Sequence, residues 1–453
     1  MIPFYYESGI VKEVLMNKEV LKQVIRESQE IVFPRMAPRE IEVPLSLRKI
    51  VAITGPRRSG KTFYLYLLCK KLIAKGVRRE RIVYINFDDP RLLPANARDI
   101  EDILESYRQL YPELKNKVNF IFLDEVQNVD GWELGVRRIH DTNRFNIFLT
   151  GSSSKLLSKE ISTHLRGRAV NFEIFPFSFR EILRAKGIKL DKNTVYSQER
   201  FSITNLLKSY LEMGGFPEIV LERNAGLRMR ILKEYIETMF FKDLVERYKI
   251  KNQPLIRELI KYLSANTANL FSLNAFYKWI KQTYPVTKRT LINYTAALED
   301  IGLFFLVRKF SYSLKEQVQT PRKCYIVDNG FSNVYGFRFT ENTGRILENT
   351  VFLELKHRQA KDPLMNIFYW QDYAKREVDF VIMRGKDIKT LIQICANVDD
   401  FRVKERETVA LLKAAEELKC KDLIVITFDY EKEERIKNKK VVFKPLWKWL
   451  IRV

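Results

Sequence analysis

The sequence predicts an α/β protein in which a parallel sheet comes first and a second α/β region comes last. Between residues 50 and 157, four short apolar segments alternate with stretches of helical periodicity, a pattern typical of a parallel sheet. A glycine-rich loop follows the first of these strands, and a helical run follows the loop. After a long helical middle, strands and helices alternate again from Tyr325 onward. At 453 residues, the chain is long enough for two or three domains.

The charge balance points to a polyanionic partner. The chain has 79 Lys and Arg residues against 56 Asp and Glu residues, and a net charge of +23 favours nucleic acid or another anionic surface. The four cysteines are widely spaced and form no C-x-x-C pair, so neither a disulfide framework nor a zinc site is expected. Since no run of 18 apolar residues and no signal-peptide pattern occurs, we expect a cytoplasmic protein without membrane insertion.

The segment ITGPRRSGKT (53–62) predicts a phosphate-binding loop. Its glycines and lysine follow G-x-x-x-x-G-K-[ST] spacing between an apolar strand and a helical run, which is the context that such a loop requires. Backbone N–H groups would surround the phosphates of ATP, Lys61 would reach the β- and γ-phosphates, and Thr62 would bind Mg²⁺. A glycine turn without a ligand is the alternative. The predicted ATP-binding residues of this loop are Gly55, Pro56, Arg57, Arg58, Ser59, Gly60, Lys61 and Thr62.

Two carboxylates follow the apolar strand at 120–123. Continuous apolar character predicts a central parallel strand, and ligands bind at the carboxyl ends of such strands. Asp124 would therefore hold Mg²⁺, and Glu125 would polarise the attacking water. Glu125 and Lys61 are thus predicted catalytic residues, with a solvated strand end as the alternative.

Further candidates for nucleotide contacts come after the next strand. Thr150 and Ser152 lie at its end, and one of these hydroxyls would sense the γ-phosphate. Arg166 or Arg168, both predicted catalytic residues, would reach the γ-phosphate of a neighbouring subunit in a homo-oligomer and stabilise charge there during hydrolysis. A pair of surface arginines with a structural salt bridge is the alternative.

In order and spacing, these motifs resemble the AAA+-type P-loop ATPases of archaea and bacteria that carry a C-terminal domain of unknown function. The matching segments of the first half are GPRRSGKT, FLDEVQNVDGWE, FLTGSSSKLL and LRGRAVNFEIFPFSFREIL. Those of the second half are GGFPE (214–218), YIETMFFKDLVE (235–246), CYIVDNGF (324–331), LENTVFLEL (347–355) and YWQDYAKREVDFVI (369–382). The resemblance implies an AAA+-like ATPase core, a helical lid, a winged-helix-like segment and an α/β end like that of restriction endonucleases.

We expect five regions along the chain. They are an N-terminal helical extension (1–44), the ATPase core (45–190), the helical lid (191–250), the winged-helix-like segment (251–323) and the nuclease-like domain (324–453). The fourth region holds twelve Lys and Arg residues against four Asp and Glu residues. A helix starting at TKRT (287–290) would place Lys288 and Arg289 where recognition helices contact DNA. A basic lid that only packs on the ATPase core is the alternative.

The last hundred residues have the order of acids found in Mg²⁺-dependent nucleases. Glu348 or Glu354 on a helix and Asp379 on a strand would bind the metal, and a lysine on the next strand would position water. That strand reads Gln393-Ile394-Cys395, so the lysine is missing, and Lys389 is the first candidate to replace it. We expect an inactive nuclease-like domain that serves as a surface for a protein partner.

The sequence therefore predicts a Mg²⁺-dependent ATPase that binds DNA and couples hydrolysis of ATP to ADP and phosphate to remodelling of DNA or nucleoprotein. Two other interpretations stay open. One is an ATP-gated switch that binds a protein partner, and the other is an ATP-coupled nuclease. Stimulation of the ATPase rate by DNA separates the first interpretation from the switch.

Overall fold

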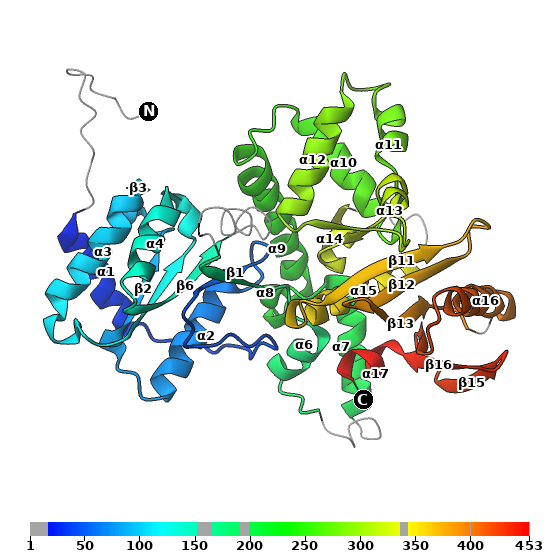
Figure 1. Cartoon of the computed structure of the whole chain (residues 1–453), viewed down its shortest axis with the longest axis horizontal. Coiled ribbons are helices and arrows are strands. Elements are labelled where there is room, and N and C mark those ends of the chain that lie inside the picture. Colours follow the sequence, from blue (N-terminus) through cyan, green and yellow to red (C-terminus); the bar gives the residue numbers. More distant parts are fainter. Residues whose placement is uncertain are drawn as a thin grey trace.

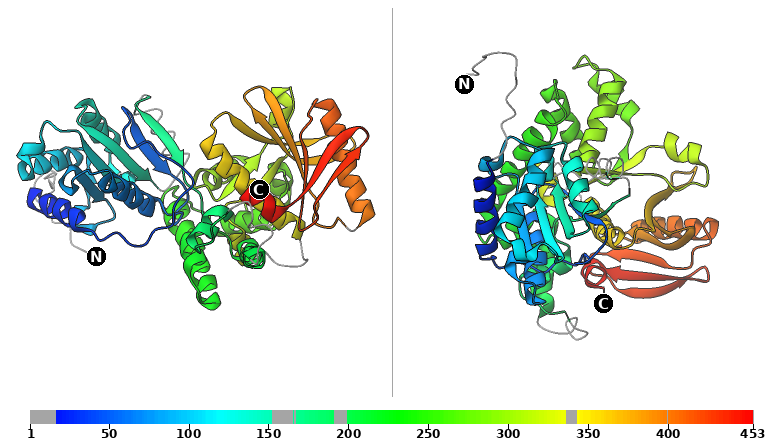
Figure 2. Two further views of the ribbon diagram at one scale, coloured as in Figure 1. Left: turned by 90° about the horizontal axis from the view of Figure 1, so that it is seen from below. Right: turned by 60° about the vertical axis from the view of Figure 1, so that its left-hand side comes forward.

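In the computed structural model the chain forms two lobes, one around the N-terminal sheet and one around the C-terminal sheet, with helices between them (Figure 1). Figure 2 shows the same two lobes from below. The structure describes residues 17–151, 165, 167–190, 199–335, 343–398 and 400–452. Within these ranges, no helix has the length and apolar character needed to cross a membrane.

The first sheet is parallel and has the strand order β2-β4-β6-β1-β7. The four predicted strands are confirmed, and β7 is an additional edge strand. Its half-exposed residues lack the apolar run that marks the other four. The order puts β1 next to β6, so the loop after β1 opens beside the carboxyl ends of β6 and β4. The strands are β1 (Ile50–Thr54), β2 (Ile82–Asn86), β4 (Asn119–Asp124), β6 (Phe145–Gly151) and β7 (Ala169–Glu173).

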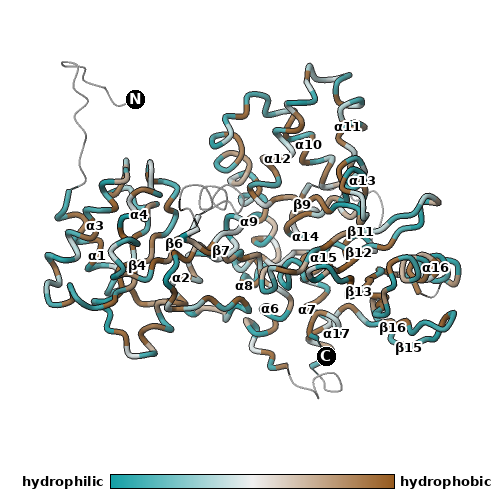
Figure 3. The backbone as a smooth tube through the Cα atoms, in the orientation of Figure 1, coloured by the Kyte–Doolittle hydropathy of each residue, from teal (hydrophilic) through white to brown (hydrophobic). Residues whose placement is uncertain are grey.

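Both faces of this sheet are covered. On β4, Ile121 and Leu123 belong to the core shared with α1, α3 and α4, whereas Phe120 and Phe122 belong to the core shared with α2. Figure 3 shows hydrophobic residues following the strands through both lobes. The elements of this lobe are α1 (Lys18–Glu30), α2 (Lys61–Ala74), α3 (Ala97–Leu110) and α4 (Trp132–Asp141), the pair β3 (Ala95–Asn96) and β5 (Val129–Asp130), and the short η1 (Arg79–Arg81), η2 (Pro90–Leu92), η3 (Pro112–Leu114) and η4 (Val126–Asn128).

Helices and a small antiparallel sheet form the middle of the chain. The sheet has the order β8-β10-β9. The helix that starts at TKRT has one apolar face, on which Leu291, Tyr294, Leu298 and Ile301 are all buried. The elements are α6 (Phe179–Ala185), α7 (Glu199–Met213), α8 (Pro217–Leu221), α9 (Ala225–Thr238), the π-helix η6 (Met239–Glu246), α10 (Gln253–Ala265), β8 (Asn269–Phe271), α11 (Leu273–Ile280), α12 (Lys288–Asp300), β9 (Phe304–Val307), α13 (Leu314–Gln319) and β10 (Arg322–Ile326).

The last sheet is mixed and has the order β11-β12-β13-β14-β16-β15. Its central pairs β13–β14 and β14–β16 are parallel, and the flanking pairs are antiparallel. The chain is therefore α/β overall, as predicted. The elements are α14 (Asn329–Tyr335), α15 (Thr343–Lys361), β11 (Met365–Gln371), β12 (Glu377–Arg384), β13 (Asp387–Ile394), α16 (Phe401–Glu417), β14 (Leu423–Thr427), β15 (Lys432–Ile436), β16 (Lys439–Pro445) and α17 (Leu446–Ile451).

Two segments that the resemblance singled out, GGFPE and CYIVDNGF, meet in the middle of the molecule. The carboxylate of Asp328 accepts a hydrogen bond of 2.6 Å from the backbone N–H of Gly215. A Cβ on Gly214, which has φ +79°, would lie 1.6 Å from Asp328 Oδ1, so only glycine fits there. The rings of Phe216 and Phe331 stack with centroids 4.8 Å apart. These contacts join α7 and α8 to the segment that leads into the last lobe.

Candidate nucleotide site

The loop between β1 and α2 has the conformation of a phosphate cradle. Gly55 has φ +150°, and a Cβ on it would lie 2.0 Å from the carbonyl oxygen of Ile174. Gly60 has φ +94° and directly precedes α2, whose first turn receives no side-chain cap. The first N–H groups of this helix therefore have no side-chain cap, as an anion-binding helix start requires.

Lys61 is held in a way that leaves it available to a ligand. Its side chain is buried, and its ammonium donates two hydrogen bonds of 3.2 Å to the carbonyl oxygens of Gly55 and Pro56. Neutral carbonyls are weaker partners for an ammonium than phosphate oxygens are, so the lysine can exchange them for a phosphate. The hydroxyl of Ser59 is also buried, and it has no partner among the described residues. An orphaned hydroxyl beside an uncapped helix indicates that the loop is built for a ligand.

The predicted magnesium ligands lie together at the carboxyl edge of the sheet. Asp124 is completely buried and accepts hydrogen bonds from the hydroxyls of Tyr84, at 2.7 Å, and Thr150. Burial raises the pKa of Asp124, and the charge of Glu125 raises it further, whereas hydrogen bonds from Thr150, Tyr84 and Thr62 lower it. Thr62, in the first turn of α2, therefore lies close enough to Asp124 for the two residues to share a Mg²⁺ ion.

Glu125 is fixed in an unusual backbone conformation. Its φ of +52° is rare for a residue with a side chain and indicates strain held by the surroundings. Its N–H donates a hydrogen bond of 2.9 Å to Thr150, and its carboxylate accepts one from Gln127. Thr150 therefore links the carboxylate of Asp124 to the backbone of Glu125, a role that the sequence did not suggest. Ser152, the other predicted sensor, lies outside the described residues.

Arg57 of the loop reaches out of the N-terminal lobe. Its guanidinium forms two hydrogen bonds of 3.0 Å to the carboxylate of Asp243 on η6. Burial would lower the pKa of Arg57, but the hydrogen bonds and charge of Asp243 outweigh burial and raise it, with a smaller contribution from Glu125. The next residue, Arg58, lies over the ring of Tyr235 at 5.2 Å. The phosphate loop is therefore in direct contact with the helical middle of the chain.

Arg39 holds the loop from the other direction, and sequence reasoning missed it. It donates to the carbonyl oxygens of Ser59, at 2.9 Å, and Phe175, at 2.5 Å, and it pairs with Glu181 at 3.1 Å. Glu181 is buried and caps the start of α6 through Ser178. Only the three-dimensional fold brings these segments to the loop, and no local pattern marks Arg39 in the sequence.

Only one of the two predicted arginine fingers lies in the part of the chain that the structure describes. Arg166 lies outside the described residues. Arg168 follows the loop before β7 and forms an ion pair of 3.2 Å with Asp141 at the end of α4. This pair is half exposed, so it contributes little to stability, and Arg168 can leave it at low cost.

The residues at this edge of the sheet fit ATP with Mg²⁺. The open helix N-terminus, the weakly held Lys61 and the orphaned Ser59 hydroxyl suit phosphate oxygens. Thr62 and Asp124 offer the oxygen ligands that Mg²⁺ prefers, and Glu125 stands beside them. Bound Mg²⁺ would neutralise charge on the phosphates.

The predicted DNA contacts lie at the start of a helix, as expected. Lys288 and Arg289 are exposed in the first turn of α12, and Thr287 caps this helix by accepting from the N–H of Thr290. The ammonium groups of Lys281 and Lys288 each lie 5.6 Å from the ring of Tyr277 on α11. This surface combines basic and aromatic side chains.

The structure decides between the acids predicted in the last lobe. Glu348 on α15 faces Asp379 on β12, whereas Glu354 pairs with Arg358 and Arg452 elsewhere. Lys389 does not replace the missing lysine, because its ammonium is exposed and pairs with Asp387 at 2.8 Å. Cys395 is buried.

Comparisons with protein families divide the chain into three parts. A model described as an AAA domain matches residues 47–183. Two models described as domains of unknown function, DUF8612 and DUF4143, match residues 204–340 and 343–449. The loop, Asp124 and Glu125 all lie within the first match.

Relatives match along most of the chain. An uncharacterized protein of Methanocaldococcus jannaschii is 37% identical over 97% of each chain. An uncharacterized protein of Haemophilus influenzae is 28% identical over 88% of this chain and 94% of its own. Among solved structures, the Walker-type ATPase of Pyrococcus abyssi is 14% identical over 72% of this chain and 97% of that chain, with a TM-score of 0.41. The AMPPCP-bound DnaA of Aquifex aeolicus is 17% identical over 61% and 86%, with a TM-score of 0.25.

Proposed function

We propose that this chain, which belongs to a family of P-loop ATPases whose AAA domain is followed by two domains of unknown function, hydrolyses ATP to ADP and phosphate with Mg²⁺ and couples hydrolysis to remodelling of DNA or nucleoprotein. One observation carries the first half of this proposal. Lys61 begins α2, directly after the loop that follows β1, and Asp124 ends β4 with Glu125 directly after it, so these residues lie at the carboxyl edge of one parallel sheet.

The residues of the site divide the work of hydrolysis. Lys61 leaves the carbonyls of Gly55 and Pro56 and binds phosphate oxygens. Thr62 and Asp124 hold Mg²⁺. Glu125 orients and polarises the attacking water. Its backbone N–H bonds to Thr150, and its carboxylate accepts a hydrogen bond from Gln127.

The ion pair between Arg57 and Asp243 supports coupling of the ATP cycle to the rest of the chain. Arg57 belongs to the phosphate loop, and Asp243 is a buried residue of η6 in the helical middle. A γ-phosphate near Arg57 competes with Asp243 for the same guanidinium, because both are anions. The presence or loss of this phosphate then changes the contact between the two parts.

The proposed DNA-binding surface lies on α11 and α12. The order α10, β8, α11, α12, β9, α13, β10, with a three-stranded antiparallel sheet, supports the assignment of a winged helix that carries the short helix α13 between its last two strands. The exposed Lys288 and Arg289 stand at the N-terminus of α12, where recognition helices contact DNA. The regional excess of basic residues supports the same assignment.

The experiment that tests this function measures ATP hydrolysis by the full chain with and without duplex DNA. We expect DNA to stimulate the rate, and the double variant Lys288→Glu/Arg289→Glu to lose both stimulation and binding. The slope of log affinity against log salt should fall by about 0.9 for each lost phosphate contact. The control Lys413→Glu/Lys421→Glu makes the same charge change at exposed positions of the last lobe and should retain both properties.

Three results would redirect the proposal. An ATPase rate that DNA leaves unchanged supports an ATP-gated switch with a protein partner on the last lobe. DNA cleavage that disappears in Asp379→Ala supports an ATP-coupled nuclease. Equal loss of affinity in both double variants places the DNA elsewhere on the chain.

The proposal includes a homo-oligomer in the cytoplasm. An arginine finger requires a neighbouring subunit, and molar mass by light scattering in the presence of ATP tests this part directly. The four cysteines are all free and buried, which suits a reducing compartment.

A further inference from the structure

A buried lysine occupies the carboxylate cluster of the last lobe. Lys323 on β10 is 1% exposed. Its ammonium lies 2.8 Å from Glu348 Oε1, 2.7 Å from Glu377 Oε1 and 2.8 Å from Asp379 Oδ1. The three acids come from α15 and β12, so the lysine is supplied by the small sheet of the preceding region.

Most of the remaining oxygen atoms of the cluster also have partners. Asp379 Oδ2 accepts from the N–H of Ile394 at 2.8 Å, and Glu377 Oε2 accepts from Gln371 at 3.1 Å. Glu348 Oε1 accepts a second hydrogen bond, of 2.7 Å, from the hydroxyl of Tyr325. The acids are therefore arranged around an ammonium and fixed donors.

Electrostatics keep this lysine charged. Burial would lower the pKa of Lys323, but Asp379 and Glu348, with help from Glu377, hold it well above its usual range. Burial and the charge of Asp379 raise the pKa of Glu348. A second positive ion in the same place would be repelled at a distance of a few ångströms in a medium of low dielectric constant.

The lysine is fixed by the packing of its strand. The amide of Asn349 on α15 accepts from the N–H of Ile326, at 3.0 Å, and donates to its carbonyl oxygen, at 3.1 Å. The ring of Tyr325 stacks on Phe352 with centroids 4.2 Å apart. Withdrawing the lysine would break these contacts between β10 and α15.

We propose that the Lys323 ammonium is the resident cation of this cluster and stands where a nuclease of this kind would hold a divalent metal ion. The nuclease-like resemblance implies Mg²⁺ here, and the residues present do not fit it. Among the described residues, no group of acidic, histidine or cysteine side chains is arranged to hold a metal ion. The inference is independent of the proposed ATPase, because it concerns a different lobe and needs no nucleotide.

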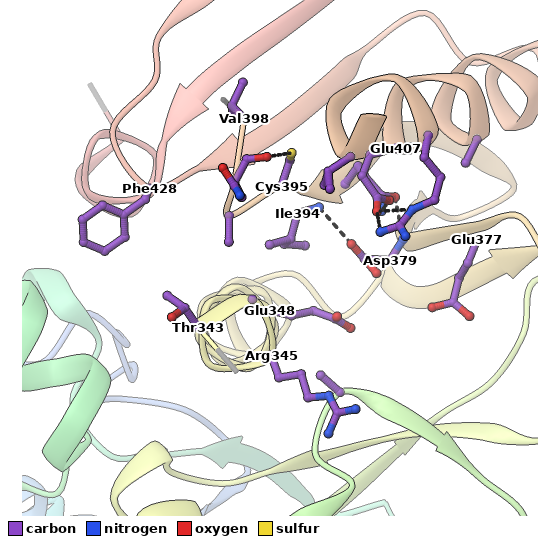
Figure 4. Close-up of a pocket in the computed structure, with 18 of the residues that line it drawn as sticks. Thr343, Arg345, Glu348, Glu377, Asp379, Ile394, Cys395, Val398, Glu407 and Phe428 are labelled. Atoms are coloured by element: carbon purple, nitrogen blue, oxygen red, sulfur yellow. Dashed lines mark hydrogen bonds and ion pairs between the residues drawn. The ribbon is translucent and has the colours of Figure 1, made fainter. Parts of the chain in front are cut away.

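The acids line one wall of a cleft of about 1260 Å³. Figure 4 shows Glu348, Glu377 and Asp379 pointing toward one another from the helix and the strand, with Arg345 below them. The side chain of Glu377 is 26% exposed at this cleft, so ions can reach the cluster, and the ammonium keeps a metal out.

The test is Mn²⁺ binding to the full chain without nucleotide, followed by electron paramagnetic resonance of the free ion. The wild type should bind no Mn²⁺ that depends on Asp379. Lys323→Met and Lys323→Ser free the cluster and should each bind about one Mn²⁺, since carboxylate oxygens are good ligands for this ion. Adding Asp379→Asn to Lys323→Met should abolish that binding, and Lys389→Met, which removes an exposed lysine of the same sheet, should behave as the wild type does.

Two results would overturn the proposal. The first is Mn²⁺ binding by the wild type that is lost in Asp379→Asn. The second is a folded Lys323→Met or Lys323→Ser protein that binds no Mn²⁺. Thermal unfolding supplies a second measurement, because Mn²⁺ should raise the midpoint of the lysine-free variants and leave that of the wild type unchanged. If neither variant folds, the wild-type titration decides, since binding dependent on Asp379 contradicts the proposal and its absence supports it.

Discussion

Lys61 and Lys323 are both buried lysines close to carboxylates, but their partners differ. Lys61 rests on two backbone carbonyls at 3.2 Å, and the nearby Asp124 is held by hydroxyls instead. Lys323 contacts three carboxylates at 2.7 to 2.8 Å. The charge of the first lysine is available for an anion, whereas the charge of the second is neutralised by carboxylates inside the protein. Residue type and burial alone therefore do not distinguish a binding site from a closed ion cluster.

The largest expected effect comes from substitutions in the nucleotide site around Lys61, which we call the open site. Lys61→Ala should abolish ATP binding, because the buried Lys61 ammonium is held only by two neutral carbonyls and is the predicted partner of the phosphates. Glu125→Gln should retain binding and lose turnover, since it removes only the group that polarises water. Isothermal titration with ATP and a phosphate-release assay measure the two properties, and hydrolysis at the wild-type rate by either variant contradicts the assignment.

The next effect tests whether a neighbour completes the open site. Arg168→Ala should lose turnover by about 10³-fold, the usual scale for an arginine finger. Mixing it with Lys61→Ala protein should restore activity, because mixed interfaces pair an intact loop with an intact arginine. Arg166→Ala is measured in parallel, and Arg138→Ala, at an exposed ion pair with Glu101, is the control. Full activity of a strictly monomeric enzyme refutes the idea.

A third effect comes from removing Lys323 from its carboxylate cluster, which we call the closed cluster. Lys323→Met should lower the free energy of unfolding by about 3–5 kcal/mol, because two buried carboxylates and one half-buried carboxylate lose their counter-ion. The control Lys389→Met should change it by less than about 0.5 kcal/mol, because that ammonium is exposed. Urea unfolding measures both, and similar stabilities of the two variants would mean that the cluster does not need its lysine.

A fourth effect concerns the buried carboxylate of Asp328, which accepts a hydrogen bond from Gly215 in the middle of the molecule. Burial raises the pKa of Asp328 to about 7, above its ordinary value of 3.8. Since the folded pKa is the higher one, the contribution of Asp328 to stability is complete below about pH 4 and is lost as the pH rises through about 7. Within that window this group should lower the free energy of unfolding by up to about 1.4 kcal/mol per pH unit. Unfolding curves for the wild type and Asp328→Asn test this, and parallel pH profiles would exclude it.

The smallest effect concerns the ion pair between Arg57 and Asp243, which connects the nucleotide site to the helical middle of the chain. A double-mutant cycle with Arg57→Met and Asp243→Asn should give a coupling energy of about 1–2 kcal/mol in the absence of nucleotide. ATP should reduce this coupling, because the phosphate competes for Arg57. Arg58→Met in place of Arg57→Met is the control. A coupling energy that ATP leaves unchanged would remove the proposed communication.

Local patterns predicted the open site, and long-range contacts built the closed one. The loop, its strand and its helix are contiguous, and the apolar run before Asp124 identifies a central strand without further information. Lys323 could not be predicted, because it lies 25 residues before Glu348 and 56 before Asp379, on a strand of another sheet. Arg39 and Asp243 were missed for the same reason, since each meets the loop only after the chain has folded. Strand β7 was not predicted, because an edge strand needs no continuous apolar run.

The number of Mn²⁺ ions bound per chain tests the contrast between the two lysines most directly. With ATP present, Glu125→Gln protein should bind one Mn²⁺, at Thr62 and Asp124, and Lys61→Ala protein should bind none. A Mn²⁺ ion that remains in Lys61→Ala protein and disappears when Asp379→Asn is added would contradict the account, because the cluster around Lys323 would then be an open metal site.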